Sequence, residues 1–249
     1  MRILPLSVLI MMLMLAAPAQ AADIPAYVAA AVAAKDRPQG DTVRDADRHP
    51  AEIMTLTGVK PGDRAVDVGT GKTGYYTKIL SRIVGADGKV IMFNPTWVAD
   101  MIPEVKDASA AMIKAGYANI EGAILPMEAI TFEQPVDLVF ISQLYHDQVW
   151  KNIDIAKMNR AVFDALKPGG VYFVIDHVGP GVTTAAQIDK LHRIEPALVK
   201  AQILAAGFKL EATSDLLANP ADPHTANVFE PSIRGKTDQF IFKFVKPTL

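Results

Sequence analysis

The sequence predicts an α/β protein with a doubly wound, mostly parallel sheet and helices on both faces. Near-continuous apolar segments alternate with amphipathic segments between residues 64 and 177, which is typical of parallel strands buried on both sides. A glycine-rich turn at 69–74 separates the first apolar segment from an apolar-periodic one. Two apolar segments near the C-terminus, 208–214 and 239–245, are expected to complete the sheet as an antiparallel pair.

The individual elements follow from the same patterns. An Ala-rich helix is expected at 25–35, and a second helix begins at Pro50, because proline fits the first helical turn, and reaches about Gly58. The predicted strands are RAVDVG (64–69), KVIMFN (89–94), IEGAIL (120–125), VDLVFIS (136–142) and VYFVID (171–176). The predicted helices between and after them follow Gly74 and lie near 107–116, 158–166 and 184–206.

The first 21 residues have the pattern of a secretory signal peptide. Arg2 precedes an apolar run at 3–17, and Ala19 and Ala21 form a small-x-small cleavage site. We therefore expect a periplasmic or secreted protein, whose residues 22–249 form one domain with an N-terminal helical extension at about 22–58. No later segment has 18 uninterrupted apolar residues, so no integral membrane segment is expected after cleavage.

Composition excludes several classes of function. The chain has no cysteine, which rules out disulfides, thiolate zinc sites and a cysteine nucleophile. Its 25 Lys and Arg residues are balanced by 27 Asp and Glu residues. Without a basic surface, nucleic acid is not an expected partner.

The glycine-rich turn predicts a ligand-binding loop. Glycines let a strand turn sharply into a helix, and they allow backbone N–H groups to approach a ligand. GTGKT also reproduces the end of the phosphate-binding loop of nucleoside triphosphatases, but Val66 stands where that motif requires glycine, so we reject this interpretation. The dinucleotide-binding loop of dehydrogenases remains open at this point.

Several segments resemble those of the class I S-adenosylmethionine-dependent methyltransferases. They are VKPGDRAVDVG (59–69), GKVIMFN (88–94), VDLVFIS (136–142), LKPGG (166–170) and AGF (206–208). The resemblance implies a seven-stranded sheet, S-adenosylmethionine as cofactor and a small-molecule or protein methyl acceptor. Four shorter segments are similar to those of exported predicted methyltransferases: YHD (145–147), DH (176–177), LHRIEP (191–196) and RGKTDQF (234–240).

The resemblance also implies a set of cofactor contacts. Asp67 would hold the loop or meet the amino group of the cofactor, Asn94 would face the ribose, and Glu128 would lie near the adenine. Three loop glycines would line the methionine part: Gly69, Gly71 and Gly74. The chain departs from the family twice. An acidic residue usually stands at the place of Asn94, and the loop has one extra residue before its third glycine.

Candidate catalytic residues follow the fourth and fifth strands, because an open α/β sheet binds ligands at the carboxyl ends of its strands. They are Tyr145, His146, Asp147, Asp176 and His177. A neutral imidazole suits the base that removes a proton from the acceptor, so His146 is the first candidate and His177 the second. Asp147 or Asp176 would orient an imidazole or bind the substrate. Three more residues are expected to bind substrate at the same edge: Arg44, Arg48 and His192.

Export conflicts with a cofactor that is made in the cytoplasm, and two other functions therefore stay open. In the first, the chain is a binding or adapter protein that has the methyltransferase fold but catalyses no reaction. Alternatively, it would be an enzyme with a divalent metal on imidazole and carboxylate ligands. The ligands of that metal would be His146, His177, Asp147 and Asp176.

The signal peptide makes a direct prediction. Mass spectrometry of the native protein should find an N-terminus at Ala22, or within a residue or two of it, because Ala19 and Ala21 define the cleavage site. Recovery of an intact Met1 in the soluble cytoplasmic fraction would contradict export.

Overall fold

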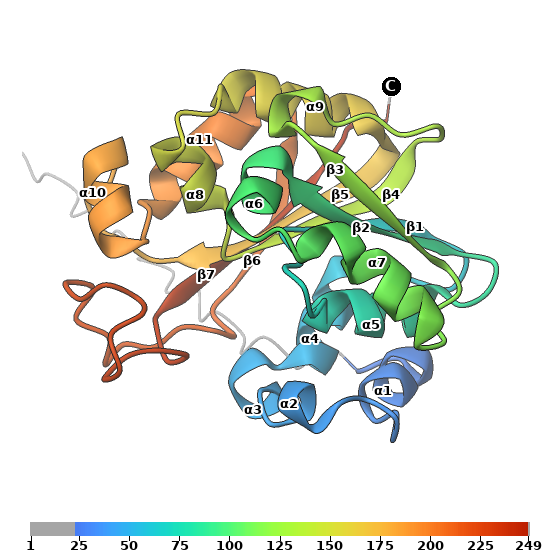
Figure 1. The fold of residues 1–249 in the computed structure, drawn as a ribbon. Coiled ribbons are helices and arrows are strands. Elements are labelled where there is room, and N and C mark those ends of the chain that lie inside the picture. Colours follow the sequence, from blue (N-terminus) through green and yellow to red (C-terminus); the bar gives the residue numbers. More distant parts are fainter. Residues whose placement is uncertain (1–22, 249) are drawn as a thin grey trace, which may run out of the picture.

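A computed structural model describes residues 23–248 and has one seven-stranded sheet (Figure 1). The strand order is β3-β2-β1-β4-β5-β7-β6. The strands are β1 (Arg64–Val68), β2 (Lys89–Pro95), β3 (Ile120–Leu125), β4 (Val136–Ser142), β5 (Leu166–His177), β6 (Lys209–Ser214) and β7 (Gln239–Val245). Strands β1 to β5 pair in parallel, and β7 is antiparallel to both β5 and β6. The predicted fold class, including the C-terminal antiparallel pair, is confirmed. The signal peptide predicted at residues 1–21 lies outside the described residues.

Helices cover both faces of the sheet (Figure 1). One face packs against α1 (Ala26–Val32), α4 (Pro50–Thr57), α5 (Tyr75–Val84) and α7 (Val105–Lys114). The other packs against α8 (Tyr145–Trp150), α9 (Ile155–Ala165), α10 (Ala185–Leu191) and α11 (Pro196–Ala205). Short helices complete the structure: α2 (Gln39–Thr42), α3 (Asp45–Arg48), α6 (Thr96–Met101) and the 3₁₀ turn η1 (Met127–Ala129). In the described part of the chain, every helix is too short or too polar to cross a bilayer.

The single helix predicted at 184–206 is wrong, because the structure has two helices there. Helix α10 ends where His192 adopts a left-handed conformation, with φ of 51°. Helix α11 begins at Pro196, and Glu195 caps it by accepting a hydrogen bond from the N–H of Ala197. Proline lacks the N–H that a continuous helix needs and disfavours helical backbone in the residue before it. The break places His192 beside α8, where its Nδ1 lies 3.3 Å from Oδ1 of Asp147.

The polar stretch before Pro50, which lies within the predicted helical extension, forms the short helices α2 and α3 and folds against α5. Asp41 of α2 forms an ion pair with Lys78 of α5, and each side chain is at most 10% exposed. Asp45 of α3 accepts two hydrogen bonds from Arg37 and one from the hydroxyl of Tyr75. These contacts hold α2 and α3 over the N-terminal end of α5.

The parallel register brings the functional segments together. Val68 at the end of β1 pairs with Ile141 of β4, and Ser142 at the end of β4 pairs with Ile175 of β5. The glycine loop after β1, the segment after β4 and the end of β5 therefore meet at one edge of the sheet, which we call the carboxyl edge.

Loss of the Asp41 carboxylate should destabilise the chain. Asp41→Asn would leave the Lys78 ammonium buried without its counter-charge, so the free energy of unfolding should fall by about 3–5 kcal/mol. Urea denaturation measures this change. The matched control is Asp164→Asn, which removes an exposed ion pair to Arg160 and should cost no more than about 0.5 kcal/mol. Equal losses in the two variants would contradict the anchoring role of Asp41.

Candidate functional site

The glycine loop joins β1 to α5 through left-handed backbone. Gly69, Gly71 and Gly74 have φ values of 74°, 58° and 53°, which glycine adopts without a steric penalty. A Cβ on Gly69 would lie 2.3 Å from Cδ2 of Leu144, so any side chain at 69 would force the Leu144 side chain to move. Glycine at 69 therefore permits the loop and the end of β4 to lie in contact.

A cavity of about 220 Å³, which we call the loop cavity, lies between this loop and residues 36–49, which we call the N-terminal segment. Its lining includes Asp67, Gly69 and Tyr76, with Arg44 and Arg48 on the side of α3. Gly71 and Gly74 are not part of the lining; they shape the turn behind it.

Asp67 presents a buried carboxyl group to the loop cavity. It is 4% exposed, and its Oδ2 accepts a hydrogen bond of 2.6 Å from the hydroxyl of Thr77. Burial disfavours the charged form and raises the pKa of Asp67 to about 7, even though the hydrogen bonds from Thr77 act in the opposite direction. A cationic group in the cavity would stabilise the carboxylate.

Asn94 holds the loop. Its Oδ1 accepts a hydrogen bond from the N–H of Gly71 at 3.2 Å, and its Nδ2 donates one to the hydroxyl of Thr70 at 3.0 Å. The ribose contact predicted for Asn94 does not fit this arrangement, because the side chain is 1% exposed and does not line the loop cavity. Glu128 is also absent from the lining of the loop cavity; its Oε1 lies 3.4 Å from the N–H of Asp154 at the start of α9.

A second cavity at the carboxyl edge, of about 500 Å³, adjoins the loop cavity, and we call it the rim cavity. Four residues line both: Arg44, Arg48, Tyr76 and Gln143. The rim cavity is also lined by Asp47, His177, Leu217, Val228, Phe229, Arg234, Gly235 and Gln239. Arg234 was not among the predicted site residues, since it lies in an irregular segment between β6 and β7. The two predicted arginines do line the cavity.

His146 is buried between two carboxylates, outside the lining of the rim cavity. Its Nδ1 lies 2.7 Å from Oδ1 of Asp176, and its Nε2 lies 3.1 Å from Oδ1 of Asp147. Burial alone would favour the neutral ring, but the charges of Asp176 and Asp147 and the hydrogen bonds to them raise the pKa of His146 to about 10. The ring is therefore protonated at pH 7. The base role predicted for His146 does not fit this charge state.

Asp147 accepts from three side chains at one oxygen. The Nε1 of Trp150 lies 2.6 Å from Oδ1, and Nδ1 of His192 lies 3.3 Å from it, in addition to the ring of His146. Burial acts to raise the pKa of Asp147, but the hydrogen bonds from His146 and His192 outweigh it and hold the pKa well below its usual range. The ligand atoms of His146, Asp147 and His192 lie within 4.8 Å of one another, so this group has the side chains to hold a metal ion.

Tyr145 follows β4, but its side chain lines neither cavity, so the structure gives no support to its predicted catalytic role. It is fully buried, and its hydroxyl accepts a hydrogen bond from Asn159 of α9 and donates one to Gln202 of α11. The side chain points into the core under these helices, away from both cavities. Asp176, also fully buried, accepts from the backbone N–H groups of His146 and His177 and so acts as a structural acceptor.

His177 is the histidine that lines the rim cavity. Its Nδ1 lies 2.7 Å from the hydroxyl of Thr237. Burial lowers the pKa of His177 to about 4, so the ring is neutral at pH 7. His192 lies behind Phe229, with the ring centroids 5.0 Å apart, and is not part of the cavity lining.

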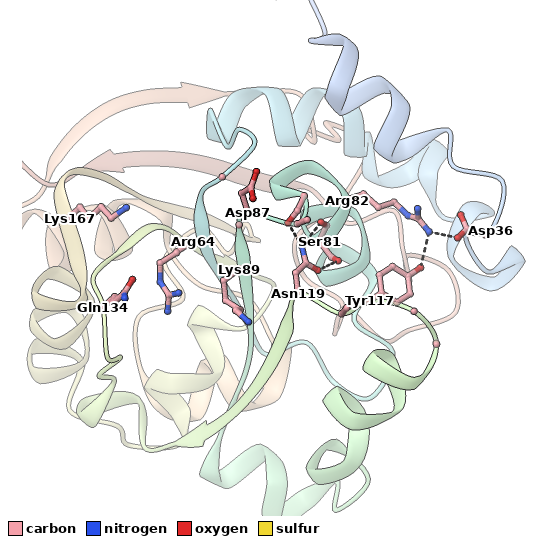
Figure 2. A pocket seen from close by; sticks show the side chains of 17 residues that line it. Asp36, Arg64, Ser81, Arg82, Asp87, Lys89, Tyr117, Asn119, Gln134 and Lys167 are labelled. Carbon is pink, nitrogen blue, oxygen red and sulfur yellow. Dashed lines mark hydrogen bonds and ion pairs between the residues drawn. The ribbon is translucent and has the colours of Figure 1, made fainter.

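A larger cavity, of about 830 Å³, opens at the opposite edge of the sheet, where the parallel strands begin (Figure 2). Its lining includes Arg64 and Lys89 at the starts of β1 and β2. Three of its cations already pair with carboxylates: Arg82 with Asp36 at 2.5 Å, Lys167 with Asp137 at 2.8 Å and Lys89 with Glu121 at 4.0 Å. It lacks the glycine loop and the histidines, and α/β sheets bind their ligands at the carboxyl edge. We therefore place the functional site at the loop and rim cavities.

Sequence comparison relates the chain to known methyltransferases. The protein-L-isoaspartate (D-aspartate) O-methyltransferase family matches residues 26–124, which include the glycine loop. A ubiquinone/menaquinone biosynthesis C-methyltransferase, UbiE of Teredinibacter turnerae, is 29% identical over 141 residues, which are 51% of this chain and 48% of that protein. The chain thus matches about half the length of this relative.

Two solved structures resemble the chain over most of its length. A putative sarcosine dimethylglycine methyltransferase from Galdieria sulphuraria has a TM-score of 0.59 and 18% identity, with 83% of this chain and 86% of that chain covered. Fibrillarin from Aeropyrum pernix, in complex with natively bound S-adenosylmethionine, has a TM-score of 0.51 and 16% identity, with 81% and 76% covered. The predicted class I resemblance is confirmed in the fold: the chain has the fold of the class I S-adenosylmethionine-dependent methyltransferases.

Proposed function

We propose that the chain is an S-adenosylmethionine-dependent methyltransferase whose acceptor binds in the rim cavity. The observation that carries this proposal is the pair of adjoining cavities at the carboxyl edge. The loop cavity is bounded by the glycine loop and the buried carboxyl group of Asp67, and the rim cavity by polar and aromatic side chains. Methyl transfer requires such an arrangement, because donor and acceptor must be held in contact and in line.

The residues of the loop cavity fit the methionine part of the cofactor. Asp67 would pair with the ammonium group, and the backbone at Gly69 would approach the ligand without a Cβ. When bound, the cofactor supplies a methyl group on a sulfonium, which is electrophilic. Gln143 lies where the two cavities meet and donates a hydrogen bond to Gln239 at 3.0 Å, so it would position the acceptor against that methyl group.

His177 would be the base that acts on the acceptor. It is the imidazole in the wall of the rim cavity, and its contact with the hydroxyl of Thr237 fixes the orientation of the ring. We assign it the role of receiving a proton from an acceptor that must lose one. His146, held between Asp147 and Asp176, would stabilise the carboxyl edge instead of exchanging protons with substrate.

The signal-peptide pattern at residues 1–21 supports a periplasmic or secreted location for this activity. Metal-dependent catalysis is a second candidate, favoured by the cluster of His146, Asp147 and His192. Elemental analysis of the purified chain tests it, since a metal enzyme would contain one divalent ion per chain and lose it in an His192→Ala variant.

Calorimetric titration with S-adenosylhomocysteine, the demethylated product, tests the cofactor site. The affinity should rise roughly eightfold between about pH 6 and pH 7.5, because Asp67 loses its proton in this range and only its carboxylate pairs with the ligand's ammonium group. The isosteric variant Asp67→Asn should bind more weakly at pH 7.5 and show a flat pH profile. No binding at either pH would contradict the proposed function. Binding with the same pH profile in both proteins would contradict the contact with Asp67.

A further inference from the structure

Three arginine side chains line the rim cavity without a carboxylate partner. Arg44 directly precedes α3, Arg48 is the last residue of α3, and Arg234 lies in the segment between β6 and β7. Within residues 23–248, none of the three guanidinium groups lies within 4.0 Å of a carboxylate oxygen. Asp47 is the one acidic residue of the lining, so the rim cavity has an excess of positive charge.

The excess arises because nearby acidic residues already have other partners. Asp36 pairs with Arg82, Asp41 with Lys78, and Asp45 with Arg37. The pair of Asp45 and Arg37 lies within the N-terminal segment, and the other two pairs join that segment to α5. The segment therefore brings two further arginines to the site but leaves no carboxylate in contact with them.

Two of the arginines, Arg44 and Arg48, contact the same aromatic ring. The guanidinium carbons of Arg44 and Arg48 lie 5.2 Å and 4.8 Å from the centre of the Tyr75 ring. Burial, together with the charge of Arg48, lowers the pKa of Arg44 from its ordinary value. Two like charges in a half-buried position cost free energy, and an anion bound between them would offset that cost.

The remainder of the wall is partly apolar. Leu217, Val228 and Phe229 contribute apolar side chains to the lining, and Tyr76 of α5 contributes an aromatic one. A volume of about 500 Å³ is in the range of small-molecule sites. The wall is complementary to a ligand with an anionic group at one end and an apolar body.

We propose that the methyl acceptor is an organic anion, whose carboxylate or phosphate group binds to Arg44, Arg48 and Arg234. Its apolar body packs against Val228 and Phe229. This inference rests on the proposed methyltransferase function, which it extends to the class of acceptor. Arg234 is the residue that best tests this proposal, because it lines the rim cavity but not the loop cavity. Arg44 and Arg48 line both cavities and would also be within reach of the cofactor.

Ligand-observed NMR titration with benzoate, phenyl phosphate and the neutral analogue benzamide tests the proposal, with and without saturating S-adenosylhomocysteine. At least one of the two anions should bind at least tenfold more tightly than benzamide. The ratio of the two anion affinities distinguishes a carboxylate acceptor from a phosphate acceptor. Equal affinity for benzamide and the anions, or no saturable binding of either anion, would overturn the proposal.

Two variants separate the acceptor from the cofactor. Arg234→Gln should weaken anion binding at least tenfold and leave the affinity for S-adenosylhomocysteine unchanged. The matched control Arg160→Gln, which removes an exposed arginine of α9 paired with Asp164, should change neither affinity. Unchanged anion binding in Arg234→Gln would overturn the proposal. A failure of S-adenosylhomocysteine to bind counts against the methyltransferase function, and the anion titration without it is still read independently.

Discussion

The ion pair between Asp41 and Lys78 is the contact on which the candidate site depends. Both side chains are nearly buried, so the pair is screened little by water and fixes the N-terminal segment on α5. Asp45, bound to Arg37 and to the hydroxyl of Tyr75, fixes the next turn of that segment. These contacts hold the segment that carries Arg44 and Arg48 beside the site. The N-terminal segment thus forms one wall of both cavities at the carboxyl edge.

The strands and the glycine loop could be predicted because their signals are local. Apolar periodicity and the positions of glycine are set by the backbone conformation of the segment itself. The charge state of His146 could not be predicted from the sequence, because it depends on Asp176 at the end of another strand. Arg234 and Tyr145 show the same limit. An arginine in an irregular segment carries no periodic signal, and a tyrosine after a strand points to the core or to the edge according to which helices cover it.

The histidines at the carboxyl edge lie in two different environments. His146, Asp147, Asp176 and His192 form a paired cluster in which each carboxylate satisfies several donors, and this cluster ties α8 to β5 and to the end of α10. His177 faces the rim cavity and stays neutral. Buried charge is tolerated where it is paired, and the unpaired charge of the arginines lies in the cavity, where a ligand can meet it.

The most direct test of this account is a crystal structure of the chain soaked with S-adenosylhomocysteine. The account predicts the ligand at the carboxyl edge, with its ammonium group at Asp67 and its sulfur facing the rim cavity between Gln143 and His177. Ligand in the larger cavity at the opposite edge of the sheet, or a ligand that leaves the loop cavity empty, would contradict it.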